Sequence, residues 1–459
     1  MTKAHRATLI ERISLLATLW LGFGLRLFQL GRDSFWADEA GQIYVALLPS
    51  IPEMFALQRL HAMAMPLDYL MTRGMRYLGL YEMILLFPAA MWDFLTLPIC
   101  YILIRRLWPK ADRNIALITT LLLAIAPLHV QYAQEMRFYA ALTFFYHTAT
   151  YWGVRAMQRG TRRTWAIFTG VTIVGVYFHP YVALSVVTTF LLYVLWYFPE
   201  PVRRMRWLLS TALIAVGALP GYFYFGAHQR YDYPLLLWED NWLTPMLEGL
   251  GWGFFSYAEA TQRMGWWGWL NAGFAVIGLV ALIRQINFTK RRPAPILILL
   301  ASSIIQTGLI IVADALKGYW FASRQILHLN TVALALTAWG VIVSARWFRA
   351  QMATRLSQDA TWLRRLALGA LIGALLLASL PTLGHYYAWP KSNGKPITRW
   401  LIEHHQEHQG EADILNLGYD AMVYLYYFQA LDAPELRAAF TTTTWDDLAT
   451  DVDAASSTA

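Results

Sequence analysis

The stretch APILILLASSIIQTGLIIVA, residues 294–313, runs for twenty residues without a single charged side chain. A helix of about 20 apolar residues is long enough to cross the ~30 Å hydrocarbon core of a bilayer. A second uncharged stretch, LALGALIGALLLASLPTLG, occupies residues 366–384. Across all 459 residues, 57% are hydrophobic and 14% are charged, whereas soluble domains carry about 25% charged residues. The sequence therefore predicts an all-α polytopic membrane protein.

The hydropathy pattern predicts about eleven transmembrane helices within residues 1–384, which we expect to form one membrane domain. The expected spans are 10–30, 83–104, 114–130, 137–154, 165–180, 181–198, 207–226, 266–286, 294–313, 326–345 and 366–384. Basic clusters fall on every second loop, at 3–12, 105–113, 155–163, 203–206, 284–292 and 346–365. Because Lys and Arg collect in cytoplasmic loops, we predict a cytoplasmic N-terminus and an extracytoplasmic C-terminus in the cell's plasma or inner membrane.

The loops expected outside contain further structure. The first outer loop, 31–82, includes QIYVALLPSIPEMFALQRL, which is too short and interrupted to span and suits one or two interfacial helices. After the last span, residues 385–459 read as a helix (396–408), a strand (DILNL) and a helix (421–429). We therefore expect a small α/β extracytoplasmic region at the C-terminal end.

Composition and motifs exclude several classes of function. The net charge of +8 comes from the short loop clusters, so it does not indicate nucleic-acid binding. Cys100 is the single cysteine, which rules out an intrachain disulfide. The sequence has no phosphate-binding or dinucleotide-binding glycine motif and no HExxH spacing. We predict no cofactor and no transition metal, while a divalent cation stays an open alternative.

Two adjacent acids, Asp38 and Glu39, follow the first expected span in the segment DSFWADEA. Neighbouring carboxylates repel each other, and Phe35 and Trp36 reduce the polarity around them, so a carboxyl pKa should rise. A carboxylate of this kind is suited to general base catalysis, which we predict for Asp38. For Glu39 two interpretations stay open, a substrate contact or an acidic cap at the N-terminus of an interfacial helix.

A second group, Glu135, Arg137 and Tyr139, stands at the outer junction of two expected spans. The planar, permanently charged guanidinium of Arg137 is suited to holding a phosphate; alternatively it extends to the lipid headgroups. Glu135 lies two residues before Arg137, so on a helix the two would not share a face. We expect Glu135 to pair elsewhere or to face the same external cavity.

Further candidates come from other outer segments and from one span. Lys317 or Arg324 in the short outer loop is a candidate second phosphate contact, the alternative being an ordinary interfacial belt. His61 is a further candidate contact from the first outer loop. Asp93 is the deepest ionisable residue, and it either lines the cavity or pairs with an arginine of a neighbouring span.

These candidates converge on the non-cytoplasmic face, where an enzyme needs an activated substrate that the membrane delivers. A sugar on a polyprenyl phosphate is such a substrate, because its lipid lies in the bilayer and its phosphate meets Arg and Lys at the interface. A carboxylate would take the proton of an acceptor hydroxyl, and cations would neutralise the departing phosphate. We predict transfer to a lipid, glycan or protein acceptor, with Asp38 as the base.

The segments LRLFQLGRDSFWADEA, HAMAMPLDYL, HVQYAQEMRFYAAL and YWFASRQILHLN occur in the order seen in GT-C membrane glycosyltransferases. The chain most resembles the bacterial branch of protein O-mannosyltransferases and aminoarabinose-lipid A transferases, over most of its first 345 residues. By this resemblance Asp38 matches the catalytic acid, Arg137 lies in the segment lining the donor cavity, and Arg324 matches a basic residue near the lipid phosphate. The resemblance also implies an inverting, extracytoplasmic reaction with a polyprenyl-phosphate sugar.

The chain departs from this family where Met-Pro-Leu-Asp-Tyr stands in place of Pro-Pro-Leu-Tyr-Tyr. Asp68 there replaces an aromatic residue and is expected to add a carboxylate to the substrate pocket. An oligosaccharyltransferase is an alternative enzyme, which would use a diphosphate lipid and often a divalent metal. A polytopic transporter, for which inverted repeats would be expected, and a catalytically silent membrane scaffold are the non-enzymatic alternatives.

Overall fold

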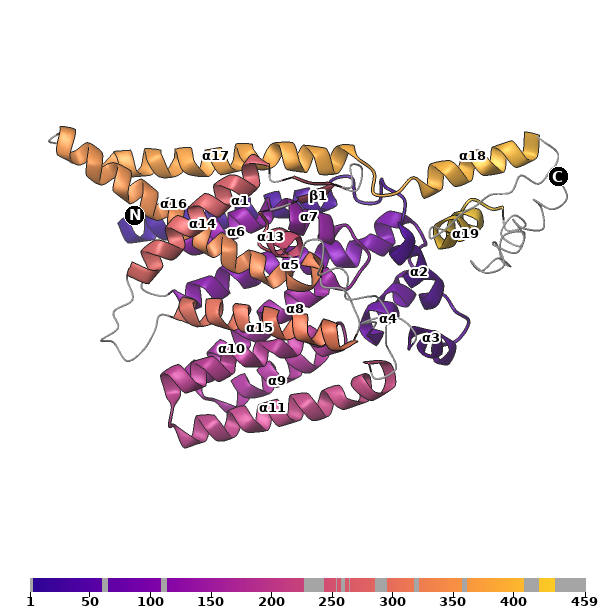
Figure 1. The fold of residues 1–459 in the computed structure, drawn as a ribbon, viewed down its shortest axis with the longest axis horizontal. Coiled ribbons are helices and arrows are strands. Elements are labelled where there is room, and N and C mark those ends of the chain that lie inside the picture. The colour runs from indigo at the N-terminus through magenta and orange to yellow at the C-terminus, as the bar shows by residue number, and fades with distance from the viewer. Residues whose placement is uncertain are drawn as a thin grey trace.

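The chain forms an elongated bundle of helices in the computed structural model shown in Figure 1. The structure describes residues 3–59, 65–108, 114–226, 243–252, 254–256, 261–263, 265–284, 295–317, 322–356, 361–407 and 421–433. In Figure 1 the helices α2, α3, α4, α18 and α19 gather at the end of the bundle opposite the start of α1. The described helices of the first expected outer loop and of the C-terminal region thus lie at the same end.

The first half of the chain contains the first expected outer loop, 31–82, and the helices before and after it. Its elements are α1 (Lys3–Leu27), α2 (Ala37–Ala46), α3 (Ile51–Gln58), α4 (Pro66–Met75), α5 (Glu82–Leu107), α6 (Asn114–Ala124), α7 (Pro127–Ala133), α8 (Tyr139–Arg159), α9 (Arg162–Val176), η1 (Pro180–Leu184), α10 (Ser185–Leu192), η2 (Tyr193–Tyr197), α11 (Pro201–Gly221) and η3 (Tyr222–Gly226). The stretch QIYVALLPSIPEMFALQRL thus contributes to two short helices, α2 and α3, within the predicted number of one or two, and α4 is a third short helix further along the first outer loop.

The second half continues the bundle and ends in two helices beyond it. Its elements are α13 (Leu243–Gly249), β1 (Phe254–Ser256), β2 (Thr261–Arg263), α14 (Trp266–Arg284), α15 (Pro295–Lys317), η4 (Ser323–Ile326), α16 (Leu327–Leu356), α17 (Thr361–Ala388), α18 (Gly394–Glu407) and α19 (Ala421–Ala430). The short antiparallel pair β1–β2 was not predicted. The predicted helices of the C-terminal region correspond to α18 and α19, while the predicted strand DILNL lies outside the described residues.

Most of the expected spans coincide with helices that are long and apolar enough to cross a bilayer. Among the described residues, seven helices are long and apolar enough to cross a bilayer, or eight if the bent pair α6–α7 counts as one span. The three remaining expected spans coincide with α1, α8 and α9. Here α1 carries Glu11, Arg12 and Arg26, and α9 has only 15 residues. For these three, a membrane crossing stays a prediction.

The bundle has a buried centre and an apolar periphery. Helix α16 packs against α14, α17 and α6, and 94% of its most apolar 18-residue stretch is buried. In contrast, the corresponding stretches of α11 and α17 are only 22% buried, although both are strongly apolar. Apolar surface of this extent is stable only against lipid or another apolar partner. These two helices therefore present apolar surface that suits contact with lipid or with another apolar partner.

A buried ion pair fixes the break between α6 and α7. The Nε of Arg26 donates to Oδ1 of Asp93 at 2.6 Å, and Nδ1 of His129 lies 2.7 Å from Oδ2 of the same carboxylate. Nη1 of Arg26 also donates to the carbonyl of Ala124 at 2.9 Å, and Nη2 to that of Leu123 at 3.4 Å. These carbonyls end α6, where the helix leaves them without intrahelical partners. Asp93 is thus paired with an arginine, the second of its two predicted roles.

The helix break redirects the chain toward the outer end of the bundle. Helices α6 and α7 meet at an angle of 56° across Ile125 and Ala126, and Pro127 begins α7. Proline cannot donate the hydrogen bond that a continuous helix would need. The side chain of Gln134 then donates to the carbonyls of Arg26 and Phe28, at 3.0 and 2.9 Å. The segment after α7 is therefore attached to the end of α1.

We predict that Arg26→Met lowers the stability of the protein by about 3–5 kcal/mol, because it leaves a buried carboxylate without its counter-charge. Thermal unfolding in detergent micelles measures the loss. Arg105→Met is the matched control, since it breaks the more exposed pair with Glu11 and should cost at most about 1 kcal/mol. The double substitution Arg26→Met/Asp93→Leu should recover part of the loss. Equal and small losses in both single variants would contradict this assignment.

Candidate functional site

Asp38 and Glu39 lie in the first turn of α2, and their side chains are in different environments. The side chain of Asp38 keeps 21% of its surface exposed, whereas that of Glu39 is fully buried. Consecutive residues on an α-helix point about 100° apart, so two adjacent acids cannot share one environment. The Asp38 carboxylate is therefore accessible from the surface, whereas the Glu39 carboxylate is not.

The Glu39 carboxylate holds three segments of the chain together. Its Oε1 accepts from the N–H of Met136 and from Nζ of Lys391, both at 2.7 Å. Its Oε2 accepts from the N–H of Trp36 at 3.2 Å, which caps the first turn of α2. Glu39 therefore joins α2 to the loop after α7 and to the linker between α17 and α18.

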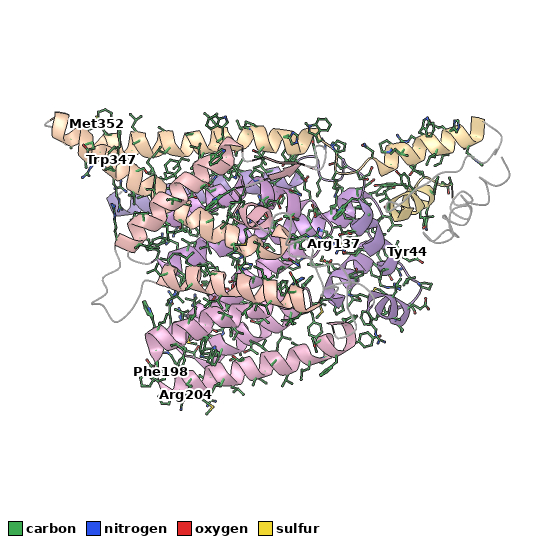
Figure 2. All side chains as sticks on the ribbon, viewed as in Figure 1. Tyr44, Arg137, Phe198, Arg204, Trp347 and Met352 are labelled. Atoms are coloured by element: carbon green, nitrogen blue, oxygen red, sulfur yellow. The ribbon has the colours of Figure 1, made fainter. Side chains whose placement is uncertain are left out.

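Arg137 lies against the residues that begin α2. Its Nη2 is 3.9 Å from Oδ2 of Asp38, and its Nη1 donates to the Asp38 carbonyl at 3.4 Å and to Oε1 of Gln42 at 3.5 Å. The guanidinium carbon sits 5.2 Å from the centre of the Phe138 ring. Its side chain is 13% exposed. Figure 2 shows Arg137 inside the end of the bundle that carries α2, while Arg204 from a basic cluster lies at the far end.

Gln42 connects this pair to α4. Its Nε2 donates to Oδ2 of Asp68 at 2.8 Å and to the Thr72 hydroxyl at 3.0 Å. Burial raises the pKa of Asp68 to about 6, although Arg137 and the Gln42 hydrogen bond both oppose the rise. Gln42 therefore bridges Asp68 and Arg137, because its side chain hydrogen-bonds to both residues.

Glu135 sits in the non-helical segment between α7 and α8, where the N–H of Arg137 donates to its carbonyl at 2.8 Å. Neither Glu135 nor Arg137 is in a helix, so the expectation that a helix would direct them to different faces does not apply to this pair. Burial raises the pKa of Glu135 to about 7; Lys391 and Arg324 lower it, and Glu39 raises it. Oε1 accepts from Gln131 at 3.4 Å. Within the described residues, Oε2 has no hydrogen-bond partner.

Arg324 approaches the same region from η4. Its guanidinium lies 5.4 Å from the centre of the Tyr139 ring, and its charge acts on both Glu135 and Arg137. Tyr139 is 2% exposed and begins α8. The side chain of Gln325 fixes the start of η4 by accepting from the N–H of Ala322 at 2.7 Å. Arg324, from the expected outer loop 314–325, is therefore near Arg137.

The other predicted site residues are placed less completely. Lys317 is the last residue of α15, and its side chain lies outside the described part, as does the whole of His61. Asp314, which precedes Lys317 on α15, is buried and accepts from the Tyr181 hydroxyl. A ligand contact by Lys317 or by His61 stays a prediction.

Sequence reasoning missed Lys391, which the linker after α17 brings to this site. Its Nζ donates to Glu39 and, at 2.9 Å, to the carbonyl of Gln134. A signal was available, because Lys391 and Lys395 both follow the last span. Lysines there run against the depletion of basic residues in outer loops. In the described ranges, no group of three or more His, Cys, Asp or Glu residues is placed to hold a metal ion.

Comparison with solved structures identifies the fold. ArnT from Cupriavidus metallidurans in the apo state aligns with a TM-score of 0.54 at 14% identity, over 93% of this chain and 85% of that one. The oligosaccharyltransferase of Archaeoglobus fulgidus, tethered with an acceptor peptide, aligns with a TM-score of 0.53 at 13% identity, over 89% of this chain. This chain spans only 60% of that archaeal protein's length.

The same archaeal oligosaccharyltransferase in complex with an inhibitory peptide and a dolichol-phosphate aligns with a TM-score of 0.50. No protein-family model and no curated protein sequence matches the chain. At these identities the likeness concerns the fold. The chain has the fold of GT-C membrane glycosyltransferases, as its sequence segments predicted.

Proposed function

We propose that this chain is a membrane glycosyltransferase that moves a sugar from a polyprenyl-phosphate donor to an acceptor hydroxyl on the extracytoplasmic side. The observation that carries the proposal is the pairing of a partly exposed carboxylate, Asp38, with Arg137, and the approach of Arg324 to Arg137. The pairing supplies a proton acceptor and permanent cations at one end of an apolar bundle. The shared fold, which also occurs in a protein solved with dolichol-phosphate, supports this reading.

Each group has a defined part in the proposed reaction. Asp38 accepts the proton of the acceptor hydroxyl as the hydroxyl oxygen bonds to the anomeric carbon of the sugar. The bond between that carbon and the phosphate oxygen breaks, and its electron pair leaves with the lipid phosphate. Because attack and departure occur on opposite faces of the sugar, the configuration inverts. Arg137 and Arg324 neutralise the phosphate as its charge develops.

The remaining residues fit roles around the two reacting groups. We assign Glu135, Tyr139 and Asp68 to contacts with the sugar or the acceptor, because they border the arginines from α4 and α8 and from the segment before α8. Lys317 and His61 belong to the same proposal on sequence grounds alone. Residues 1–384 would form the catalytic membrane domain, and residues 385–459 an extracytoplasmic region that packs on the first outer loop.

The assay that distinguishes the proposed donor from the oligosaccharyltransferase alternative uses two defined lipids. Membranes containing the protein are incubated with polyprenyl-phosphate sugars and with polyprenyl-diphosphate sugars, each with and without a chelator. We expect transfer from the monophosphate lipid. Transfer from the diphosphate lipid alone, lost with chelator, would support the alternative instead. The lack of transfer from either lipid would favour a transporter or scaffold.

We predict that Asp38→Asn abolishes transfer while donor retention is preserved, because it removes the proton acceptor and keeps the side-chain size. The loss should be at least about 10²–10⁴-fold. Asp33→Asn is the matched control, since Asp33 lies in the same segment and pairs with Arg32. Single-turnover transfer with bound, labelled donor measures the effect. Near wild-type transfer by Asp38→Asn would remove Asp38 as the base.

We also predict that Arg137→Gln and Arg324→Gln weaken binding of the polyprenyl-phosphate donor, each by about 1.5–3 kcal/mol, because a charge-assisted hydrogen bond to phosphate is lost. Competition between labelled donor and free polyprenyl phosphate measures this affinity. Arg32→Gln is the control, because Arg32 is an exposed arginine that bonds to Asp33 and Gln29. An unchanged donor affinity in both site variants would contradict the phosphate assignment.

A further inference from the structure

The strongest feature that the proposed reaction leaves unexplained is a closed set of contacts around Lys391. Its side chain is 11% exposed, and its Nζ donates to Oε1 of Glu39 at 2.7 Å and to the Gln134 carbonyl at 2.9 Å. The N–H of Met136 donates to the same Glu39 oxygen at 2.7 Å. Lys391 therefore restrains the backbone before Glu135 directly, and the backbone at Met136, directly before Arg137, through the Glu39 carboxylate.

This contact network reaches the residues of the proposed chemistry through the backbone. Met136 is the immediate neighbour of Arg137, whose guanidinium meets Asp38 on α2. Glu39 fixes the first turn of the same helix. A buried carboxylate that loses its paired lysine is strongly destabilised, so we expect the segment to rearrange rather than keep its position.

We propose that Lys391 is a positioning residue for the outer-face site. Its ammonium group ties the C-terminal segment to α2 and to the Gln134–Arg137 segment, and so holds Arg137 beside Asp38. This inference deepens the proposed function and rests on it for its meaning in catalysis. It makes the region after α17 a structural part of the site rather than an appendage.

Lys395 provides a matched comparison in the same segment. Its Nζ lies 2.9 Å from Oε1 of Glu82, which also accepts from the Tyr427 hydroxyl at 3.0 Å. It joins the C-terminal region to the start of α5, away from the Gln134–Arg137 segment. Its side chain is 38% exposed. Loss of Lys395 should loosen the C-terminal region without releasing the site.

Hydrogen–deuterium exchange of the full-length protein in lipid nanodiscs tests the positioning role without reference to activity. Lys391→Met should raise the exchange rate of the peptide that contains Met136 on the order of tenfold, and Lys395→Met should leave that peptide unchanged. Lys391→Gln keeps a donor and serves the same comparison if the methionine variant does not fold. Unchanged exchange at Met136, or an equal increase in both lysine variants, would overturn the inference.

The pH dependence of sugar transfer is a second test. If Lys391 had only a structural role, its removal would not shift the pH at which the transfer rate changes. Lys391, Glu39 and Arg324 interact electrostatically with Glu135, and Gln131 donates a hydrogen bond to it. The buried hydroxyl groups of Tyr132 and Tyr386 are also close enough to interact with its charge. Burial raises the pKa of Glu135 to about 7, so we expect the transfer rate to change near pH 7 if Glu135 contacts the substrate as proposed. Because Lys391 lowers this pKa, its removal should move that step to higher pH. Lys391→Arg should restore the position of the step, and Lys395→Met should leave it in place.

Hydrogen exchange and the pH profile together distinguish failure of the proposed transferase function from failure of the positioning role of Lys391. If the wild-type protein transfers no sugar but the exchange pattern is as expected, the proposed function fails and the positioning role stands. If the wild-type protein transfers sugar and Lys391→Met changes neither exchange nor the pH step, the positioning role fails alone.

Discussion

The buried contact of Arg26 with Asp93 is the constraint on which the outer site depends. A charged side chain inside an apolar bundle is stable only when its partners are fixed, and Arg26 finds them in a carboxylate and in the carbonyls that end α6. That interaction stabilises the break before Pro127, and Gln134 then attaches the following segment to the end of α1. The position of Arg137 follows from this path of the chain.

The outer site combines rigidity with access through two adjacent acids. Glu39 is buried and fully engaged, so it anchors the start of α2 to segments that are far apart in sequence. Asp38 lies on the next face of the same helical turn and stays partly exposed beside Arg137. A proton acceptor needs this arrangement, because a fixed backbone lets one carboxylate meet a substrate with little loss of order on binding. The two adjacent acids after α1 thus differ in their surroundings, one buried and paired and the other partly exposed.

The sequence was sufficient for the membrane fold, and it named Asp38, Arg137 and Arg324, which the structure brings near one another. Long uncharged runs and alternating basic loops predicted the helices, because both signals are local. Local patterns could not show that Asp93 pairs with Arg26, 67 residues away, or that Glu135 and Arg137 lie outside a helix. Lys391 was missed for the same reason, since its role comes from contact with Glu39, 352 residues earlier. Partners distant in the chain are set by the fold.

The central claim is that one end of this bundle holds a lipid phosphate beside a carboxylate base. A map of the full-length protein with an added polyprenyl phosphate tests it most directly. The account predicts phosphate density within hydrogen-bonding distance of Arg137 or Arg324, on the side of α2 that presents Asp38. Density at the opposite end of the bundle, near the basic cluster that includes Arg204, would contradict the account.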